Sequence, residues 1–251
     1  MQINLSSVFI EVENFLFQLL FFLVQFPKTL IKGILNPKWV HTHITDELKK
    51  EQHEQFKEYM NPLYFFIVVY VIVNLTASSI LGGETQAGTQ VFSAQGLAAS
   101  SISFLLLPIP FSVALIKIVN RTVVSAEYRR TYYMQLIIFG ISLVLFILTS
   151  LIALPLLAEE TPAAGMTLAH TLSLLATLVA FPAFGIWFLV AQTIIFYNEA
   201  ILAQTPAESN LRKLAKAIGL VVLCTLLDII ILMNSDLIDS VVNTVTQSFG
   251  L

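Results

Sequence analysis

Charge is scarce in this chain of 251 residues. Charged residues make up 12% of the sequence and apolar residues 57%, whereas soluble domains carry roughly 25% charged residues. A soluble fold of this length would need far more polar surface, so the composition favours a membrane protein. The net charge of −3 gives no argument for a nucleic-acid partner.

Cysteine and an N-terminal basic region are also nearly absent. The single cysteine, Cys224, lies inside an apolar stretch, which excludes a disulfide framework and a thiol metal site. It is interpreted as a small packing residue. Residues 1–14 contain Glu11 and Glu13 but no Lys or Arg, so no cleavable signal is predicted.

The familiar catalytic motifs are missing as well. The chain has no glycine-rich phosphate loop, no His-Glu-x-x-His, no Gly-x-Ser-x-Gly and no Cys-x-x-Cys. We therefore predict no cofactor and favour a non-enzymatic protein. An intramembrane enzyme that modifies lipid is the weaker alternative.

What the chain does have is a series of long apolar stretches. They cover residues 63–81, 97–119, 132–157, 167–197 and 217–233. A spanning helix needs about 20 mostly apolar residues, and its backbone groups must be paired internally. We expect an all-α integral membrane protein in which residues 62–234 form a bundle of five transmembrane helices and 235–251 a short external tail.

The basic residues alternate with these stretches in a way that predicts orientation. All thirteen fall before the first stretch or around the second and fourth connections: Lys28, Lys32, Lys38, Lys49, Lys50, Lys57, Lys117, Arg121, Arg129, Arg130, Arg212, Lys213 and Lys216. Positive charge resists translocation, so these segments, and with them residues 1–61, are predicted to be cytoplasmic.

The N-terminal region is expected to contribute two helices. Residues 15–26 are apolar but span only ~18 Å as a helix, too short to cross a bilayer. We expect an interfacial or re-entrant helix closed by Pro27, with a sixth span over residues 8–27 as the alternative.

A charged amphipathic helix is predicted over residues 44–60, along the cytoplasmic surface. Its apolar positions recur at multiples of four, at Ile44, Leu48, Phe56 and Met60. Thr45 or Asp46 is the expected N-cap, and Asn61-Pro62 the expected end.

Three histidines form the only metal-like group in the sequence. His41, His43 and His53 lie near Asp46 and Glu47, but their spacing matches no strong zinc pattern. We interpret them as solvated loop residues and predict no metal site, keeping the three histidines as weak candidates.

Polar residues gather in the predicted outer halves of the five spans. The candidates are Asp228, His170, Asn74, Ser100, Ser103, Thr149 and Thr225. One hypothesis is an external polar pocket in which Asp228 and His170 handle a proton or cation. The other is structural, because small and hydroxyl residues join membrane helices.

Prolines mark further positions inside the spans. Pro108 and Pro110 interrupt the second stretch and Pro182 the fourth. Each removes a backbone hydrogen bond and can kink a helix, and broken helices frame the sites of many transporters.

The order of these features resembles the Yip-like group of five-span membrane proteins and related uncharacterised bacterial proteins. The likeness rests on Phe26-Pro27-Lys28-Thr29-Leu30, on Asn61-Pro62, and on the segment from Pro110 through Arg121 to Tyr132. The Asp-Leu-Tyr-Gly-Pro signature of the trafficking members is missing, which argues against a Rab-linked role. The resemblance implies a five-helix bundle without enzymatic chemistry.

These observations favour a scaffold, a regulator or a subunit of a membrane complex. Its expected partners are membrane lipids and a second protein or a second copy of the chain. The alternative is a small transporter, permease subunit or channel component that uses the outer polar pocket. The short loops favour a bacterial inner membrane over a eukaryotic endomembrane.

Overall fold

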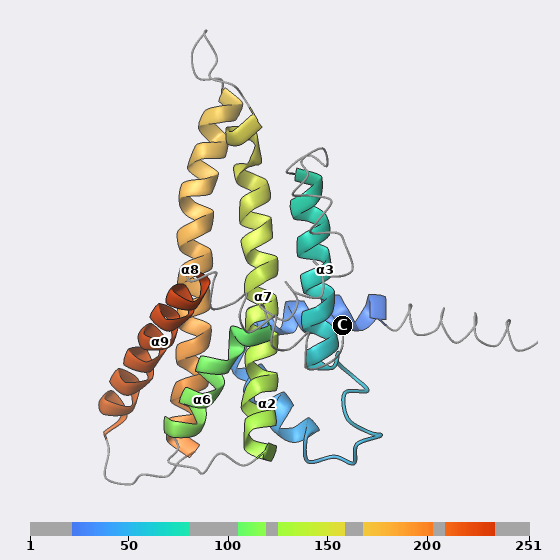
Figure 1. Cartoon of the computed structure of the whole chain (residues 1–251), viewed down its shortest axis with the longest axis vertical. Coiled ribbons are helices and arrows are strands. Elements are labelled where there is room, and N and C mark those ends of the chain that lie inside the picture. Colours follow the sequence, from blue (N-terminus) through green and yellow to red (C-terminus); the bar gives the residue numbers. More distant parts are fainter. Residues whose placement is uncertain (1–21, 81–104, 119–124, 159–167, 203–208, 234–251) are drawn as a thin grey trace, which may run out of the picture.

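The computed structural model describes residues 22–80, 105–118, 125–158, 168–202 and 209–233, and every regular element in them is a helix. A first helix covers residues 22–35. It is followed by α2 (Pro37–Glu47), α3 (Pro62–Ile80), α6 (Pro108–Ile118), α7 (Ser125–Ala158), α8 (Leu168–Leu202) and α9 (Asn210–Met233) (Figure 1).

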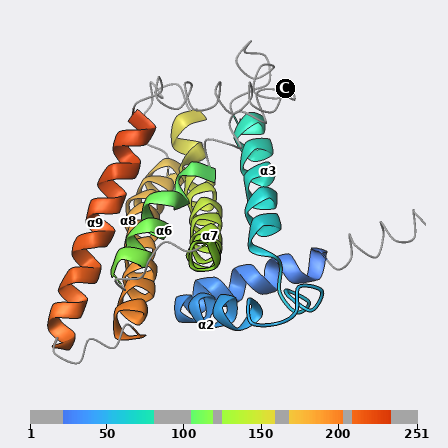
Figure 2. The same cartoon turned by 60° about the horizontal axis from the view of Figure 1, so that its bottom comes forward.

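The long helix α7 lies at the centre of the molecule. It packs against α3, α8, α6 and α2. Helix α3 stands on one side of it and α8 on the other, while α2 and helix 22–35 run across the long helices (Figures 1 and 2). Half of the most apolar stretch of α7 is buried, against 6% of that of α8. Helix α7 is therefore the core helix, and most of the apolar stretch of α8 before Ala191 is exposed or half-buried.

The hydrophobic core lies where the crossing helices meet the long ones. Its fully buried side chains include Ile44 of α2, Phe111 of α6, Ile138 of α7 and Phe196 of α8. The ring of Phe111 meets that of Phe196 edge-on, with centroids 6.2 Å apart, the arrangement that aromatic pairs prefer. Each large apolar side chain buried here contributes roughly 1.5–3 kcal/mol.

Two helices are long and apolar enough to cross a membrane. These stretches are Ser125–Leu151 within α7 and Leu174–Ile201 within α8; α3 and α6 hold shorter apolar stretches, Pro62–Thr76 and Pro108–Lys117. Where the structure describes them, the predicted spans lie largely in helices, but length and composition alone support two crossings rather than five. Part of the second stretch, 97–104, lies outside the described residues, as do 1–21 and the tail 235–251.

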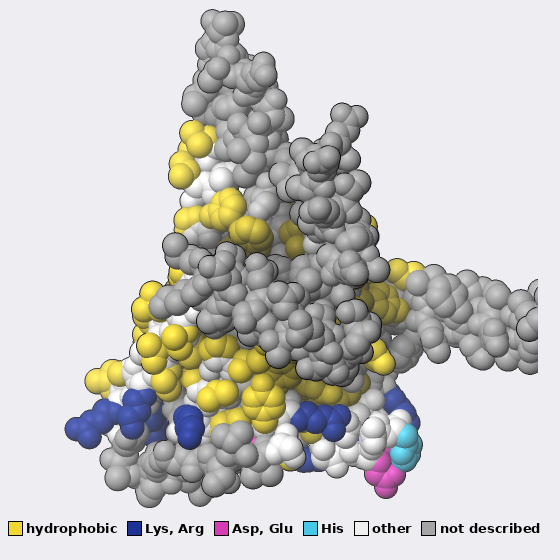
Figure 3. All heavy atoms as spheres, in the orientation of Figure 1, with side chains coloured by type: hydrophobic (Ala, Val, Ile, Leu, Met, Phe, Trp, Pro, Cys, Tyr) yellow, Lys and Arg dark blue, Asp and Glu magenta, His cyan; other side chains and the backbone are white. Residues whose placement is uncertain are grey.

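Basic side chains gather at one end of the molecule. Figure 3 shows a band of Lys and Arg across the lower end of the visible face, with hydrophobic side chains above it. In the same orientation, α7 begins and α8 ends near this lower end (Figure 1).

The predicted helix over residues 44–60 is wrong. Helix α2 covers Pro37–Glu47, and residues 48–60 form turns and bends. Asn36 caps α2, since its side chain accepts the Trp39 N–H and Pro37 occupies the first turn, where its missing N–H costs nothing. The Asn-Pro pair is a stronger start signal than Thr45 or Asp46.

Two further expectations about the N-terminal region fail. Helix 22–35 continues through Pro27 and ends only before Asn36, because a proline removes one hydrogen bond and can leave the rest of a packed helix intact. His41 and His43 lie inside α2 and not in a solvated loop.

The prolines predicted to interrupt later helices have different positions. Helix α8 continues through Pro182. Leu107 is a turn, and Pro108 and Pro110 lie in the first turn of α6.

Candidate functional site

Three buried, ionisable side chains meet at the end of the long helices. They are His41 of α2, Arg130 of α7 and Glu199 of α8, hereafter the ion triad. Nη1 and Nη2 of Arg130 donate to Oε1 and Oε2 of Glu199 at 2.5 and 3.0 Å. Nε2 of His41 lies 2.8 Å from Oε1 of the same carboxylate. The Glu199 side chain is only 1% exposed.

The helices themselves bring these side chains together. His41 shares the buried face of α2 with Val40 and Ile44, while Arg130 lies near the start of α7 and Glu199 near the end of α8. Since α7 and α8 run in opposite directions (Figure 1), these two ends are adjacent. A bidentate Arg–carboxylate pair is strong and directional, so the ion triad holds α2 across both long helices.

A second polar cluster fixes the chain that follows α2. Glu47 accepts the Phe56 N–H at 2.6 Å and the Lys50 ammonium at 2.5 Å. Phe56 has a φ of 57°, a left-handed conformation that costs a non-glycine residue about 1–2 kcal/mol. The Glu47 hydrogen bond and the burial of the Phe56 ring offset this cost and hold the loop in one shape.

Aromatic rings enclose His43 beside this cluster. Its ring stacks on Trp39 with centroids 4.6 Å apart and meets Tyr59 edge-on at 4.9 Å. Burial lowers the pKa of His43, against the opposing charge of Glu47. For Glu47, burial acts to raise the pKa, but the hydrogen bonds from Lys50 and Phe56 outweigh it and lower the pKa overall.

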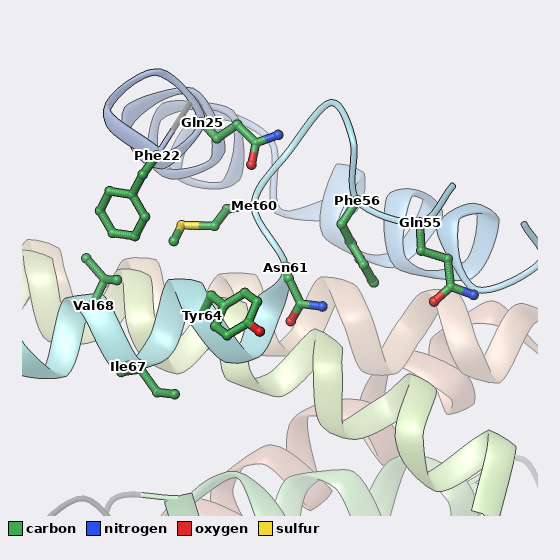
Figure 4. A pocket seen from close by; sticks show the side chains of 9 residues that line it. All are labelled: Phe22, Gln25, Gln55, Phe56, Met60, Asn61, Tyr64, Ile67 and Val68. Atoms are coloured by element: carbon green, nitrogen blue, oxygen red, sulfur yellow. The ribbon is translucent and has the colours of Figure 1, made fainter. Parts of the chain in front are cut away.

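A groove of about 640 Å³ opens next to this loop. Helix 22–35, the loop before α3 and the first turns of α3 line it, through Phe22, Gln25, Gln55, Phe56, Met60, Asn61, Tyr64, Ile67 and Val68 (Figure 4). The loop is held against helix 22–35, because Gln25 donates to the Lys57 carbonyl at 2.7 Å and Thr29 accepts the Met60 N–H at 3.0 Å.

The polar residues predicted to form an outer pocket have mostly local partners. Asn74, Thr149 and Thr225 each donate to a carbonyl of their own helix. Asp228 is different. Its side chain is buried, and its Oδ1 has no hydrogen-bond partner among the described residues. Ser100, Ser103 and the side chain of His170 lie outside the described residues, so the pairing of His170 with Asp228 stays a prediction.

The three histidines do not converge. His41 contacts Glu199, His43 stacks on Trp39, and exposed His53 lies 3.5 Å from Glu51. Among the residues that the structure describes, no group of three or more His, Cys, Asp or Glu side chains is placed to hold a metal ion.

Sequence reasoning missed two interhelical pairs. In the sequence, Arg130 counts only as one of the basic residues that predict orientation, and Glu199 is not among the candidate residues. Gln135 and Gln192, both fully buried between α7 and α8, hydrogen-bond to each other at 2.7 Å. The signal available in the sequence was a polar residue within an apolar run. Gln135 lies five residues after Arg130, and Gln192 lies seven residues before Glu199.

Fold and composition define the class as an all-helical chain with two helices long and apolar enough to cross a membrane. No protein-family model matches the chain, and no curated protein or solved structure is significantly similar to it. The function therefore has to be argued from the side chains themselves.

Proposed function

We propose that this chain is a five-span membrane protein that acts without catalysis, as a scaffold, regulator or subunit of a membrane complex. Support comes from the two long apolar helices and from the outer face of α9, where Leu223, Leu226 and Ile229 are each about half exposed. Exposed apolar side chains along a whole helix face suit lipid rather than water.

The proposed orientation puts residues 22–61 on the cytoplasmic side, in a bacterial inner membrane. The band of Lys and Arg at one end (Figure 3) supports this orientation, because basic residues are retained in the cytoplasm. The Yip-like layout remains part of the same proposal.

The ion triad is the observation that carries the proposed scaffold role. It joins an N-terminal helix to two long helices, because Arg130 and Glu199 lie 89 and 158 residues beyond His41 in the chain. A protein that organises partners needs a surface of constant shape, and this junction holds the N-terminal region in one position. Within the described residues the groove lies in this same region and not in the core of the bundle.

The proposal is tested by native mass spectrometry of the protein in mild detergent, wild type beside Asp228→Asn. The expected result is a second protein, or a second copy of the chain, bound in fixed ratio and unaffected by the substitution. Purified protein that moves a solute across liposomes would contradict the proposal.

A small transporter or channel component is the second candidate, and Asp228 favours it. A buried carboxylate with one oxygen that finds no partner among the described residues is costly in a membrane and commonly belongs to an ion or substrate path. This version predicts a bound small molecule, or a solute flux, that is lost in Asp228→Asn. Flux unchanged by both Asp228→Asn and His170→Ala would count against it.

A further inference from the structure

The groove between helix 22–35 and α3 is divided into an apolar and a polar part. Figure 4 shows Phe22, Val68 and Ile67 toward one end, with Gln25 beside Phe22. The Asn61 amide, the Tyr64 hydroxyl and Gln55 lie toward the other end, with Phe56 beside Gln55. Its volume of about 640 Å³ lies within the range of roughly 300–1,000 Å³ typical of ligand sites. The shape and polarity fit an amphiphile better than a uniformly polar or apolar molecule.

Two side chains at the polar end have hydrogen-bond donors without a partner among the described residues. The Asn61 side chain accepts the Leu63 N–H through Oδ1, which leaves its amide NH₂ available, and the described residues supply no partner for the Tyr64 hydroxyl. Arg129 lies beside this end, since Nη2 donates to Oε1 of Gln55 at 3.4 Å. Two donors, on Asn61 and Tyr64, therefore line this end of the groove, and Arg129 adjoins it through Gln55.

Arg129 also carries a positive charge that no described carboxylate neutralises. Its guanidinium lies over the Tyr133 ring, 5.2 Å from the centroid. The carboxylates of the adjoining loop have other partners, because Glu58 pairs with Lys28 at 3.0 Å and Glu54 lies 4.0 Å from Lys57. An unpaired guanidinium next to neutral donors is the usual setting for phosphate recognition.

The apolar end continues onto an exposed surface. Leu23 and Val24 of helix 22–35 and Ile67 of α3 are 59%, 66% and 43% exposed. If the chain is embedded as proposed above, this surface faces lipid, and an acyl chain can enter the groove sideways without crossing water.

We propose that this groove binds one phospholipid with an anionic headgroup. The phosphate lies against Arg129, Asn61 and Tyr64, and one acyl chain lies along Phe22, Ile67 and Val68. This inference rests on the proposed membrane location, and it identifies the class of lipid that the N-terminal region binds.

The test uses native mass spectrometry of delipidated full-length protein titrated with phosphatidylglycerol or phosphatidylcholine. We expect one tightly bound phosphatidylglycerol per chain and weaker phosphatidylcholine. Arg129→Gln should weaken phosphatidylglycerol binding about tenfold, the usual value of one charge-assisted hydrogen bond. It should weaken phosphatidylcholine less, because the choline cation already offsets part of the attraction between the phosphate and Arg129. Arg212→Gln, at an exposed position near the start of α9, is the matched control and should change neither.

A second variant tests the apolar end. Ile67→Trp fills the groove at a side chain that is already 43% exposed, so the fold should tolerate it while binding of both lipids falls. Equal affinity for the two lipids, or phosphatidylglycerol binding that survives both substitutions, would overturn the proposal. Binding of inorganic phosphate without phospholipid would overturn it too.

Failure of this site can be told from failure of the proposed membrane location. A chain that alkaline carbonate releases from membranes would contradict the location. A chain that stays in the membrane fraction but shows no preference for phosphatidylglycerol would contradict only the lipid site.

Discussion

Glu199 is the residue on which the N-terminal junction depends. It is the single carboxylate that satisfies both Arg130 and His41, and it has almost no access to solvent. A buried ion pair does not need to be strongly stabilising as a whole, because desolvation offsets much of the attraction. Removing one member is different, since loss of Glu199 takes the bidentate partner from the buried Arg130 and leaves it only the ion pair with Glu127.

Glu199→Gln is therefore expected to destabilise the protein by about 3 kcal/mol. The amide keeps the size of the side chain but loses the charge that pairs with Arg130. Thermal unfolding in detergent measures the effect as a fall in Tm. Glu58→Gln is the matched control, because Glu58 is 68% exposed and pairs with an exposed Lys28; its Tm should stay near that of the wild type. Equal losses in both variants would contradict the role of Glu199.

The loop after α2 is expected to loosen in mild acid. Because burial holds the pKa of His43 below its ordinary value of 6.5, the folded protein binds this proton more weakly than the unfolded chain. Its contribution to stability is complete above pH 6.5 and is lost as pH falls through the lowered pKa. The lowered pKa of Glu47 changes the stability in the same direction, but its contribution is lost only below the ordinary pKa of 4.5.

Trypsin measures this loosening, since Lys49, Lys50 and Lys57 lie in the loop. Cleavage relative to a reference peptide should rise between pH 7.5 and 5.5 in the wild type. His43→Phe keeps an aromatic ring against Trp39 and should abolish most of the rise, whereas His53→Phe, at an exposed position, should keep it. A rise that persists in His43→Phe would show that another group is responsible.

Sequence reasoning found several of the residues of these clusters but not their partners. His41, His43 and Glu47 were grouped as a weak metal set because they are close in sequence. The structure instead pairs His41 with a residue 158 positions away, and no local pattern encodes such a contact. Asp228 was recognisable because a charge within an apolar run is conspicuous. Gln135 and Gln192 were less conspicuous, because a neutral amide disturbs an apolar run less than a charge does.

Among the helices, α3 and α7 approach each other closely at Gly140. A Cβ added to Gly140 of α7 would lie 2.8 Å from Cε1 of Phe65 and 3.1 Å from its Cδ1. The Phe65 ring is fully buried, so it has little room to move away.

Gly140→Ala is expected to push α3 from α7 and to cost about 1–3 kcal/mol. The matched control is Gly219→Ala in α9, where an added Cβ meets nothing within 4 Å and alanine should gain up to about 1 kcal/mol of helix propensity. Thermal unfolding of the two variants should shift in opposite directions. A shared direction would contradict the close packing of α3 on α7.

Helix positions were easier to predict than helix ends. Apolar runs of about 20 residues placed α3, α7, α8 and α9 because hydrophobicity persists along them. Helices α7, α8 and α9 extend past those runs into polar or mixed sequence. The ion triad holds the added turns of α7 and α8, through Arg130 and Glu199. The 44–60 prediction failed for the converse reason: Phe56 and Met60 are buried as expected, but a loop with side-chain hydrogen bonds brings them there.

For the chain as a whole, the proposed orientation predicts which segments a membrane-impermeant maleimide can reach. In a Cys224→Ser background, Ala163→Cys should be labelled in intact cells. Glu51→Cys and Ser209→Cys should be labelled only after the membrane is opened, because they lie among the basic segments. The reverse pattern would contradict the orientation, and labelling of all three in intact cells would contradict membrane insertion.

The lengths of α7 and α8 have a mechanical consequence. With 34 and 35 residues they measure about 50 Å each, well beyond the roughly 30 Å of a hydrocarbon core. Helix α2 is bound to both helices near one end, so α7 and α8 are expected to pivot about the ion triad. A thicker or thinner bilayer changes helix tilt. With α7 and α8 inserted as proposed, such a change in tilt is expected to move the far ends of both helices most and to load the contact between Arg130 and Glu199.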